Sequence, residues 1–133
     1  MGDKPRQDLV ARAQRFSVRL LRIVDELLHD PYFPRRVTEQ LAAAGTAIGN
    51  NLSEAQTPLT RPQLIQVYTT ALRDSYEAKH CLATIRDLGK GTPSEVEWLH
   101  GEADEFAAVL FTSIRRLRNP PDTPPPHTRR RRR

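Results

Sequence analysis

Residues 41–55, LAAAGTAIGNNLSEA, have the apolar spacing of a helix but hold two glycines four residues apart, Gly45 and Gly49. Each glycine inside a helix costs about 1 kcal/mol relative to alanine. Such a cost is accepted when another backbone comes close or a polar group must be placed with care. We therefore expect Gly45 and Gly49 to mark a close helix contact, either within one subunit or between subunits.

Three further segments share the helical spacing, in which apolar residues recur at alternating steps of three and four. The four expected helices span about residues 7–29, 36–56, 61–88 and 93–118. The predicted core positions are Leu9, Ala13, Phe16, Leu20, Ile23, Leu27; Leu41, Ala44, Ile48, Leu52, Ala55; Tyr68, Ala71, Ser75, Ala78, Leu82, Ile85; and Val96, Leu99, Ala103, Phe106, Leu110, Ser113 or Ile114, and Leu117.

Start and stop signals separate these segments. Thr60 with Gln63 predicts a capping box for the third helix, and Gly89 predicts its end. Thr92, Pro93 and Glu95 together predict the start of the fourth helix. Prolines follow the other helix ends.

Four amphipathic helices with short connections predict one all-α domain over residues 1–118, an antiparallel up-down four-helix bundle. At 1.5 Å per residue the bundle would be roughly 30–40 Å long. Residues 119–133, NPPDTPPPHTRRRRR, form a Pro- and Arg-rich tail that cannot bury apolar surface, and we expect it to be disordered.

The charge is concentrated in that tail. Of the net charge of +5, the five arginines and one aspartate of residues 119–133 supply +4, which leaves +1 for the other 118 residues. The folded body is therefore nearly neutral. A lone Cys81 excludes an intramolecular disulfide, and no apolar run reaches the roughly 18–20 residues of a membrane helix. With no secretion signal in the first ten residues, we expect a cytoplasmic protein without a membrane partner.

Several stretches between Leu9 and Leu117 resemble the four-helix-bundle family that includes the proteins encoded in 23S rRNA intervening sequences. Gln40-Leu41, Ala44, Ile48 and Asn51-Leu52-Ser53-Glu54 match its second helix, although Ala47, Gly49 and Ala55 replace the residues usual there. Residues 71–77 match its third helix, and residues 105–106 and 110–114 match its fourth. The resemblance implies a homopentamer. Related accessory proteins of diversity-generating retroelements bind a reverse transcriptase and nucleic acid.

Three polar residues fit the family pattern: Asn51, Glu54 and Glu77. Asn51 and Glu54 lie three residues apart and share one side of their helix. We interpret the three as a hydrogen-bonded network that fixes helix register or a subunit contact. An acid/base pair of carboxylates is the alternative.

Two Glu-x-x-His pairs, Glu77 with His80 and Glu97 with His100, could suggest a di-metal carboxylate enzyme. The core positions of their helices turn these side chains outward or to the flank, so the ligands would not converge. We therefore expect no metal, no cofactor and no catalytic residues. Tyr32, Phe33 and Trp98 are expected to pack at the ends of the bundle.

Two groups of arginines could bind nucleic acid. The stronger group combines the end of the fourth helix with the tail: Arg115, Arg116, Arg118, Arg129, Arg130, Arg131, Arg132 and Arg133. The weaker group is a stripe on the first helix, Arg12, Arg15, Arg19 and Arg22, for which pairing with acids of a neighbouring helix is the alternative. A solubilising role for the terminal arginines also stays open.

The sequence thus predicts a non-enzymatic, oligomeric accessory or scaffold protein that binds nucleic acid, or a nucleic-acid-processing enzyme such as a reverse transcriptase, through basic residues. Its partners would be further copies of itself and RNA or DNA. The alternatives are the di-metal enzyme and a purely structural oligomer without a nucleic-acid partner.

Overall fold

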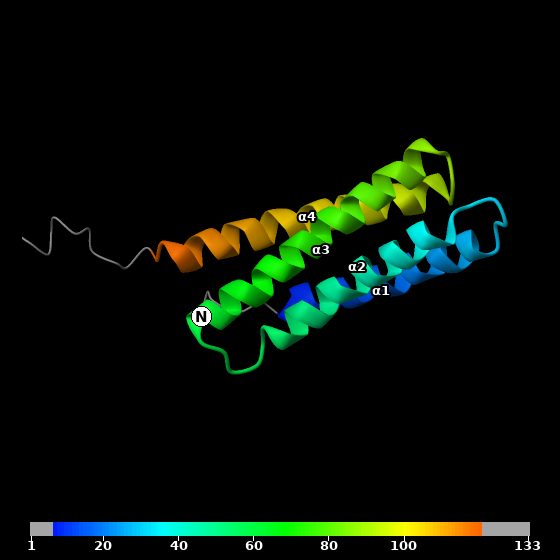
Figure 1. Ribbon diagram of the computed structural model, residues 1–133. Coiled ribbons are helices and arrows are strands. Elements are labelled where there is room, and N and C mark those ends of the chain that lie inside the picture. Colours follow the sequence, from blue (N-terminus) through cyan, green and yellow to red (C-terminus); the bar gives the residue numbers. More distant parts are fainter. Residues whose placement is uncertain (1–6, 121–133) are drawn as a thin grey trace, which may run out of the picture.

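The computed structural model describes residues 7–120, and within them the chain forms four helices and no strand. The helices are α1 (Gln7–Leu28), α2 (Arg35–Glu54), α3 (Arg61–Asp87) and α4 (Pro93–Arg118). Figure 1 shows α1 beside α2 and α3 beside α4, with one pair lying against the other. The predicted all-helical bundle is confirmed.

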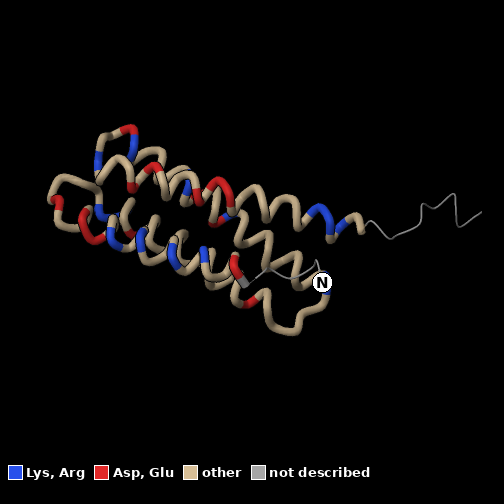
Figure 2. Tube along the Cα trace, turned by 180° about the vertical axis from the view of Figure 1, so that it is seen from behind, with Lys and Arg blue, Asp and Glu red and all other residues tan. Residues whose placement is uncertain are grey.

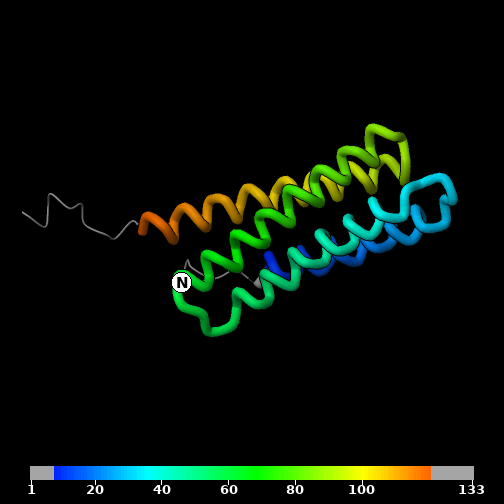
Figure 3. Tube along the Cα trace, in the orientation of Figure 1, coloured from blue at the N-terminus to red at the C-terminus, as the bar shows by residue number. Residues whose placement is uncertain are grey.

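The connections between helices lie at alternate ends of the bundle. Those joining α1 to α2 and α3 to α4 lie at one end, and that joining α2 to α3 lies at the other, as the continuous trace in Figure 3 shows. Lys90 and Asp30 link the two neighbouring connections by an ion pair of 2.9 Å. The two helix pairs are therefore linked at that end of the bundle.

The second helix ends at Glu54, two residues before the expected Gln56. Beyond that point the backbone tightens into bonds three residues apart, from the Gln56 amide to the Ser53 carbonyl at 3.1 Å and from Thr57 to Glu54 at 3.0 Å. Such tightening satisfies carbonyls that a helix end leaves without partners. Pro58 then prevents the chain from continuing as a helix.

The third helix has the predicted signals at both ends. The Thr60 hydroxyl accepts a bond from the Gln63 amide, and the Gln63 side chain accepts one from the Thr60 amide, which completes the capping box. At the other end Gly89 has a φ of +70°, and the Lys90 amide reaches back to the Ile85 carbonyl at 3.1 Å. This is the Schellman arrangement, in which glycine tolerates the left-handed backbone.

The start of α4 differs from its predicted capping. Thr92 stands at the N-cap position and Pro93 at the first helical position, but the Thr92 side chain makes no capping hydrogen bond. The Glu95 carboxylate is also turned elsewhere, because it accepts two hydrogen bonds from Arg19 of α1. An interaction between helices has taken the place of a local cap.

The predicted apolar stripes form the core. All the expected core positions are buried except Leu9 and Ser113, which are half-buried, and Ile114 takes the place of Ser113. The pattern did not single out Val24, Phe33, Thr38, Leu64, Val67, Cys81 and Ala107, which are buried as well. Within residues 7–120, every buried side-chain nitrogen or oxygen has a hydrogen-bond partner.

None of the described helices is long and apolar enough to cross a membrane. Of the three aromatic residues expected at the bundle ends, Phe33 is buried there, but Tyr32 beside it is 92% exposed. The expectation was wrong for Tyr32, whose side chain is exposed to solvent in the turn between α1 and α2. Trp98 packs partly buried on α4.

Candidate nucleic-acid interface

Basic residues follow α1 along its length, and Figure 2 shows them on the side of the bundle opposite the view of Figure 1. Arg12 donates two hydrogen bonds to the Glu102 carboxylate of α4, at 3.3 and 2.7 Å. Two helical turns further on, Arg19 does the same to Glu95, at 2.6 and 2.8 Å. These two arginines therefore join α1 to α4.

Both pairs are reinforced by aromatic rings of α4. The Arg19 guanidinium lies 3.6 Å from the centre of the Trp98 ring, and that of Arg12 lies 5.8 Å from the centre of Phe106. The hydrogen bonds from Arg19 lower the pKa of Glu95, and those to Glu102 raise the pKa of Arg12. Charge-assisted bidentate bonds of this kind are stronger than neutral ones.

Arg15 and Arg22, the other members of the stripe, are exposed. Neither makes an ion pair or a side-chain hydrogen bond within residues 7–120, although the charge of Arg22 helps to lower the pKa of Glu95. The stripe therefore divides into two arginines that hold α4 and two that face solvent.

The end of α4 carries three exposed arginines, Arg115, Arg116 and Arg118, in its last turn. None of them makes an ion pair in the described part of the chain. Arg115 lies 5.8 Å from the centre of the Phe111 ring, which is 52% exposed. Arg115 and Arg118 also line a hollow of about 340 Å³ between α3 and α4, together with Leu72 and Phe111. The expected contributors Arg129–Arg133 lie outside the described residues.

The two glycines of α2 face α1 within the same chain. A Cβ atom on Gly45 would collide with the Leu20 side chain, since it would lie 3.0 Å from Cδ2 and closer still to Cδ1. On Gly49 it would meet Ala13 and Ser17 at an ordinary 3.7 Å. Gly45 therefore makes the close helix contact, whereas the position of Gly49 has room for a Cβ atom.

Asn51 of α2 binds an aspartate of α3 that the sequence pattern did not single out. The Asn51 amide donates to the Asp74 carboxylate at 3.1 Å and to its own helix at the Ala47 carbonyl. Burial raises the pKa of Asp74, and the charge of Glu77 raises it further. Glu54 is exposed, and no hydrogen bond within residues 7–120 joins its side chain to Asn51 or Glu77.

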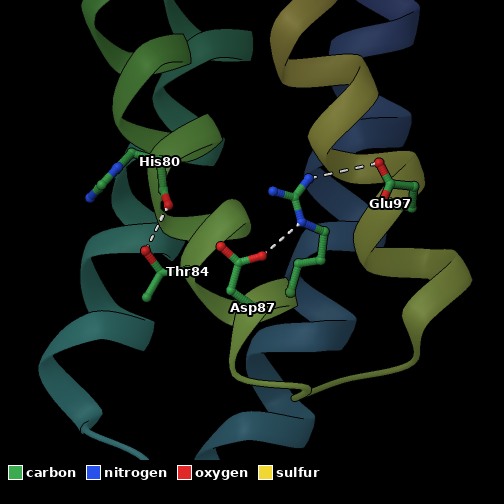
Figure 4. A network of polar contacts seen from close by, with 5 residues as sticks. His80, Thr84, Asp87 and Glu97 are labelled. Carbon is green, nitrogen blue, oxygen red and sulfur yellow. Dashed lines mark hydrogen bonds and ion pairs between the residues drawn. The ribbon is translucent and has the colours of Figure 1, made fainter.

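The Glu-x-x-His pairs remain spread over the surface. Figure 4 shows the His80 ring of α3 turned away from Glu97 of α4, whose carboxylate faces Arg86 at 3.9 Å instead. Arg86 also contacts Asp87 at 3.2 Å. In the described part of the chain, no three His, Cys, Asp or Glu side chains are grouped so that they could hold a metal ion.

Two features escaped the sequence interpretation. Asp74 precedes Glu77 by three residues and so shares its helix face, a spacing that could have indicated it. The hollow beside Phe111 had no comparable signal, because it depends on how α3 and α4 lie against each other.

Comparison with known proteins supplies one match. No curated protein and no solved structure is similar enough to match this chain. The sequence model of the 23S rRNA-intervening sequence proteins, in contrast, matches residues 6–112, which include α1, α2 and α3 whole and most of α4. On that match, the chain belongs to the family of 23S rRNA-intervening sequence proteins.

Proposed function

We propose that the protein is a cytoplasmic, non-enzymatic accessory protein, an antiparallel up-down bundle that assembles into a homopentamer and binds nucleic acid through basic residues. RNA and DNA are the direct partners in this proposal. A nucleic-acid-processing enzyme such as a reverse transcriptase would be brought in with them.

The observation that carries the proposal is the contrast between neutralised and free arginines. Arg12 and Arg19 are occupied by carboxylates, whereas Arg115, Arg116 and Arg118 are exposed and without ion pairs in residues 7–120. From that helix end the chain continues into residues 119–133, which hold five more arginines. Positive charge also complements the partial negative charge of a helix C-terminus.

Phosphate binding by such a surface has a measurable signature. Each phosphate contact releases counterions, so that the logarithm of the binding constant falls linearly with the logarithm of salt concentration. The slope reports the number of contacts, about 0.9 per phosphate for duplex DNA and about 0.7 for single strands.

The test is fluorescence anisotropy of labelled RNA and DNA oligonucleotides over a salt series. We expect binding at low salt, and a shallower slope after removal of residues 129–133 or after the triple change of Arg115, Arg116 and Arg118 to Gln. A matched control changes three other exposed arginines, Arg35, Arg36 and Arg73, to Gln. Absence of binding at low salt would leave a structural oligomer, and equal losses in the control would mean that only net charge matters.

A further inference from the structure

The seam between α3 and α4 changes in character along its length. Near the α3–α4 connection it is crossed by ion pairs: Lys79–Asp104 at 2.7 Å and Arg86–Glu97 at 3.9 Å. Towards the other end no carboxylate of these two helices is available, because none precedes Asp74 in α3 and none follows Glu105 in α4. Figure 2 shows the last turns of α4 with basic residues only. This half of the seam therefore carries uncompensated positive charge.

The hollow of about 340 Å³ opens in this half of the seam. Leu72, Phe111 and Ile114 supply its apolar lining, and Arg115 and Arg118 supply its charge. No carboxylate lines it. A cavity of about 150 Å³ can hold a benzene molecule, so this hollow has room for an aromatic ring of a ligand.

Phe111 gives the hollow an exposed aromatic surface. Its side chain is 52% exposed, although burial of a phenyl ring is favourable. The Arg115 guanidinium lies 5.8 Å from the centre of that ring, and neither Arg115 nor Arg118 makes an ion pair within residues 7–120. An aromatic ring beside free cations is the combination with which proteins bind single-stranded nucleic acid, since bases stack on the ring and phosphates meet the cations.

The first carboxylates along α3 beyond the hollow belong to the opposite side of that helix. Asn51 of α2 donates a hydrogen bond to Asp74. Burial and the charge of Glu77 raise the pKa of Asp74 and of Cys81. Glu77 therefore acts on the side of α3 that faces α2, and an anion in the hollow would meet the arginines of α4 instead.

We propose that the hollow binds an unpaired nucleotide of a single-stranded nucleic acid. The base lies on the Phe111 ring beside Leu72, and Arg115 and Arg118 hold the flanking phosphates. This subsite rests on the nucleic-acid binding proposed above and adds a preference for unpaired strands, because the faces of paired bases are covered by their neighbours in a duplex. Every base has a face that can stack, so no sequence preference is expected.

Two probes with the same number of phosphates separate the base from the backbone. One is a fluorescein-labelled oligothymidylate, and the other is a single strand of equal length built from abasic sites. Fluorescence anisotropy measures the binding of each probe to the full chain over a salt series. We expect the wild type to bind the oligothymidylate more tightly, by about 5- to 150-fold for one stacked base.

The variant Phe111→Leu should reduce that preference. It removes the ring without removing a phosphate contact, so binding of the abasic probe and its salt dependence should stay unchanged. Phe111→Tyr keeps an aromatic face and should keep the preference. Tyr32→Leu is the matched control, because it removes an exposed ring at the opposite end of the bundle. Circular dichroism verifies that each variant folds.

Three results would overturn the base subsite while leaving phosphate binding by the arginines intact: equal binding of the two probes by the wild type, a preference that survives Phe111→Leu undiminished, or an equal loss of both probes in that variant. Absence of binding to either probe at low salt would overturn the subsite together with the proposed function. The two failures are therefore distinguishable.

Discussion

The first helix is joined to its two neighbours in opposite ways. Towards α2, Gly45 leaves no side chain between the helices, and Leu20 packs into the space where a Cβ atom would lie. Towards α4, the arginines Arg12 and Arg19 reach across to carboxylates. Phe16 and Phe106 fill the space beneath them, with ring centres 5.5 Å apart at 82°.

This difference shows that one helix can pack against its neighbours in two ways, through a glycine that lets α2 come close and through long arginines that reach α4. The α1–α2 contact depends on shape, and it should respond to added volume but little to salt or pH. The α1–α4 contact depends partly on charge, so it should weaken with screening and with protonation of its carboxylates. The following predictions test this distinction, starting with the largest effect.

The largest effect is expected for Gly45→Val. Its methyl groups would collide with the fully buried Leu20, and overpacking of this kind costs about 1–3 kcal/mol. Urea denaturation measures the loss in the free energy of unfolding. The matched control is Gly49→Ala, whose Cβ finds ordinary contacts at 3.7 Å and which should gain up to about 1 kcal/mol from helix propensity.

A double-mutant cycle connects the first effect to its cause. Leu20→Ala removes the side chain that Gly45→Val would strike, so the cost of Gly45→Val should shrink in the Leu20→Ala background. If the two costs simply add, the close contact between Gly45 and Leu20 is not what limits the size of residue 45.

The Arg12–Glu102 pair should contribute less. Glu102→Gln removes the charge while keeping the shape. Because the two side chains are partly buried, with exposed fractions of 31% and 16%, we expect a cost of about 1 kcal/mol in the free energy of unfolding. Added salt should reduce that cost, whereas the cost of Gly45→Val should be insensitive to salt. Glu39→Gln, an exposed change elsewhere on α2, serves as the control. A salt-independent cost at Glu102 would argue against a charge-based contact.

The α1–α4 contact should also respond to acid. Hydrogen bonds from Arg19 lower the pKa of Glu95 below its ordinary 4.5. A carboxyl with a lowered pKa in the folded state contributes stability that is fully present above its unfolded value and is lost as the pH falls through the folded value. We therefore expect the urea midpoint to fall as the pH drops below 4.5. Glu95→Gln should flatten that decline, and an unchanged profile in the variant would contradict the assignment.

Asp74 should respond in the opposite direction, with the smallest effect. Its pKa is raised above 3.8 by burial and by Glu77, so its ionised form destabilises the fold at neutral pH. Asp74→Asn should stabilise the protein at neutral pH by less than about 1 kcal/mol, because solvent screens a half-buried carboxyl. The gain should vanish below pH 3.8, where the carboxyl is protonated in both states. A destabilised variant at neutral pH would show that the bond from Asn51 outweighs the burial of charge.

Sequence reasoning succeeded where the controlling interactions are local. The spacing of residues such as Phe16, Leu20 and Leu52 identifies buried faces, because a helix repeats every 3.6 residues whatever surrounds it. The Thr60–Gln63 capping box is equally local. Glu95 shows where such reasoning fails. It stands at the capping position predicted for α4, but its carboxylate binds Arg19, 76 positions away in the chain.

Only the outline of the candidate site could be predicted from the sequence. The basic residues at the end of α4 could be identified from their order in the chain, but their neighbour Phe111 and the hollow beside it could not. The stripe of arginines on α1 was visible, yet nothing in its spacing separates Arg12 and Arg19 from Arg15 and Arg22. That division depends on which side of α1 the fourth helix lies.

The sequence by itself determined the four helices, the apolar stripe of each and the local signals at the ends of the third, because these depend on residues within a few positions of one another. Only the tertiary structure decided which arginines are neutralised, which glycine is closely covered and where exposed rings meet a hollow. Those outcomes depend on the order and offset of neighbouring helices, and a helix's own spacing carries no information about the surface it will meet.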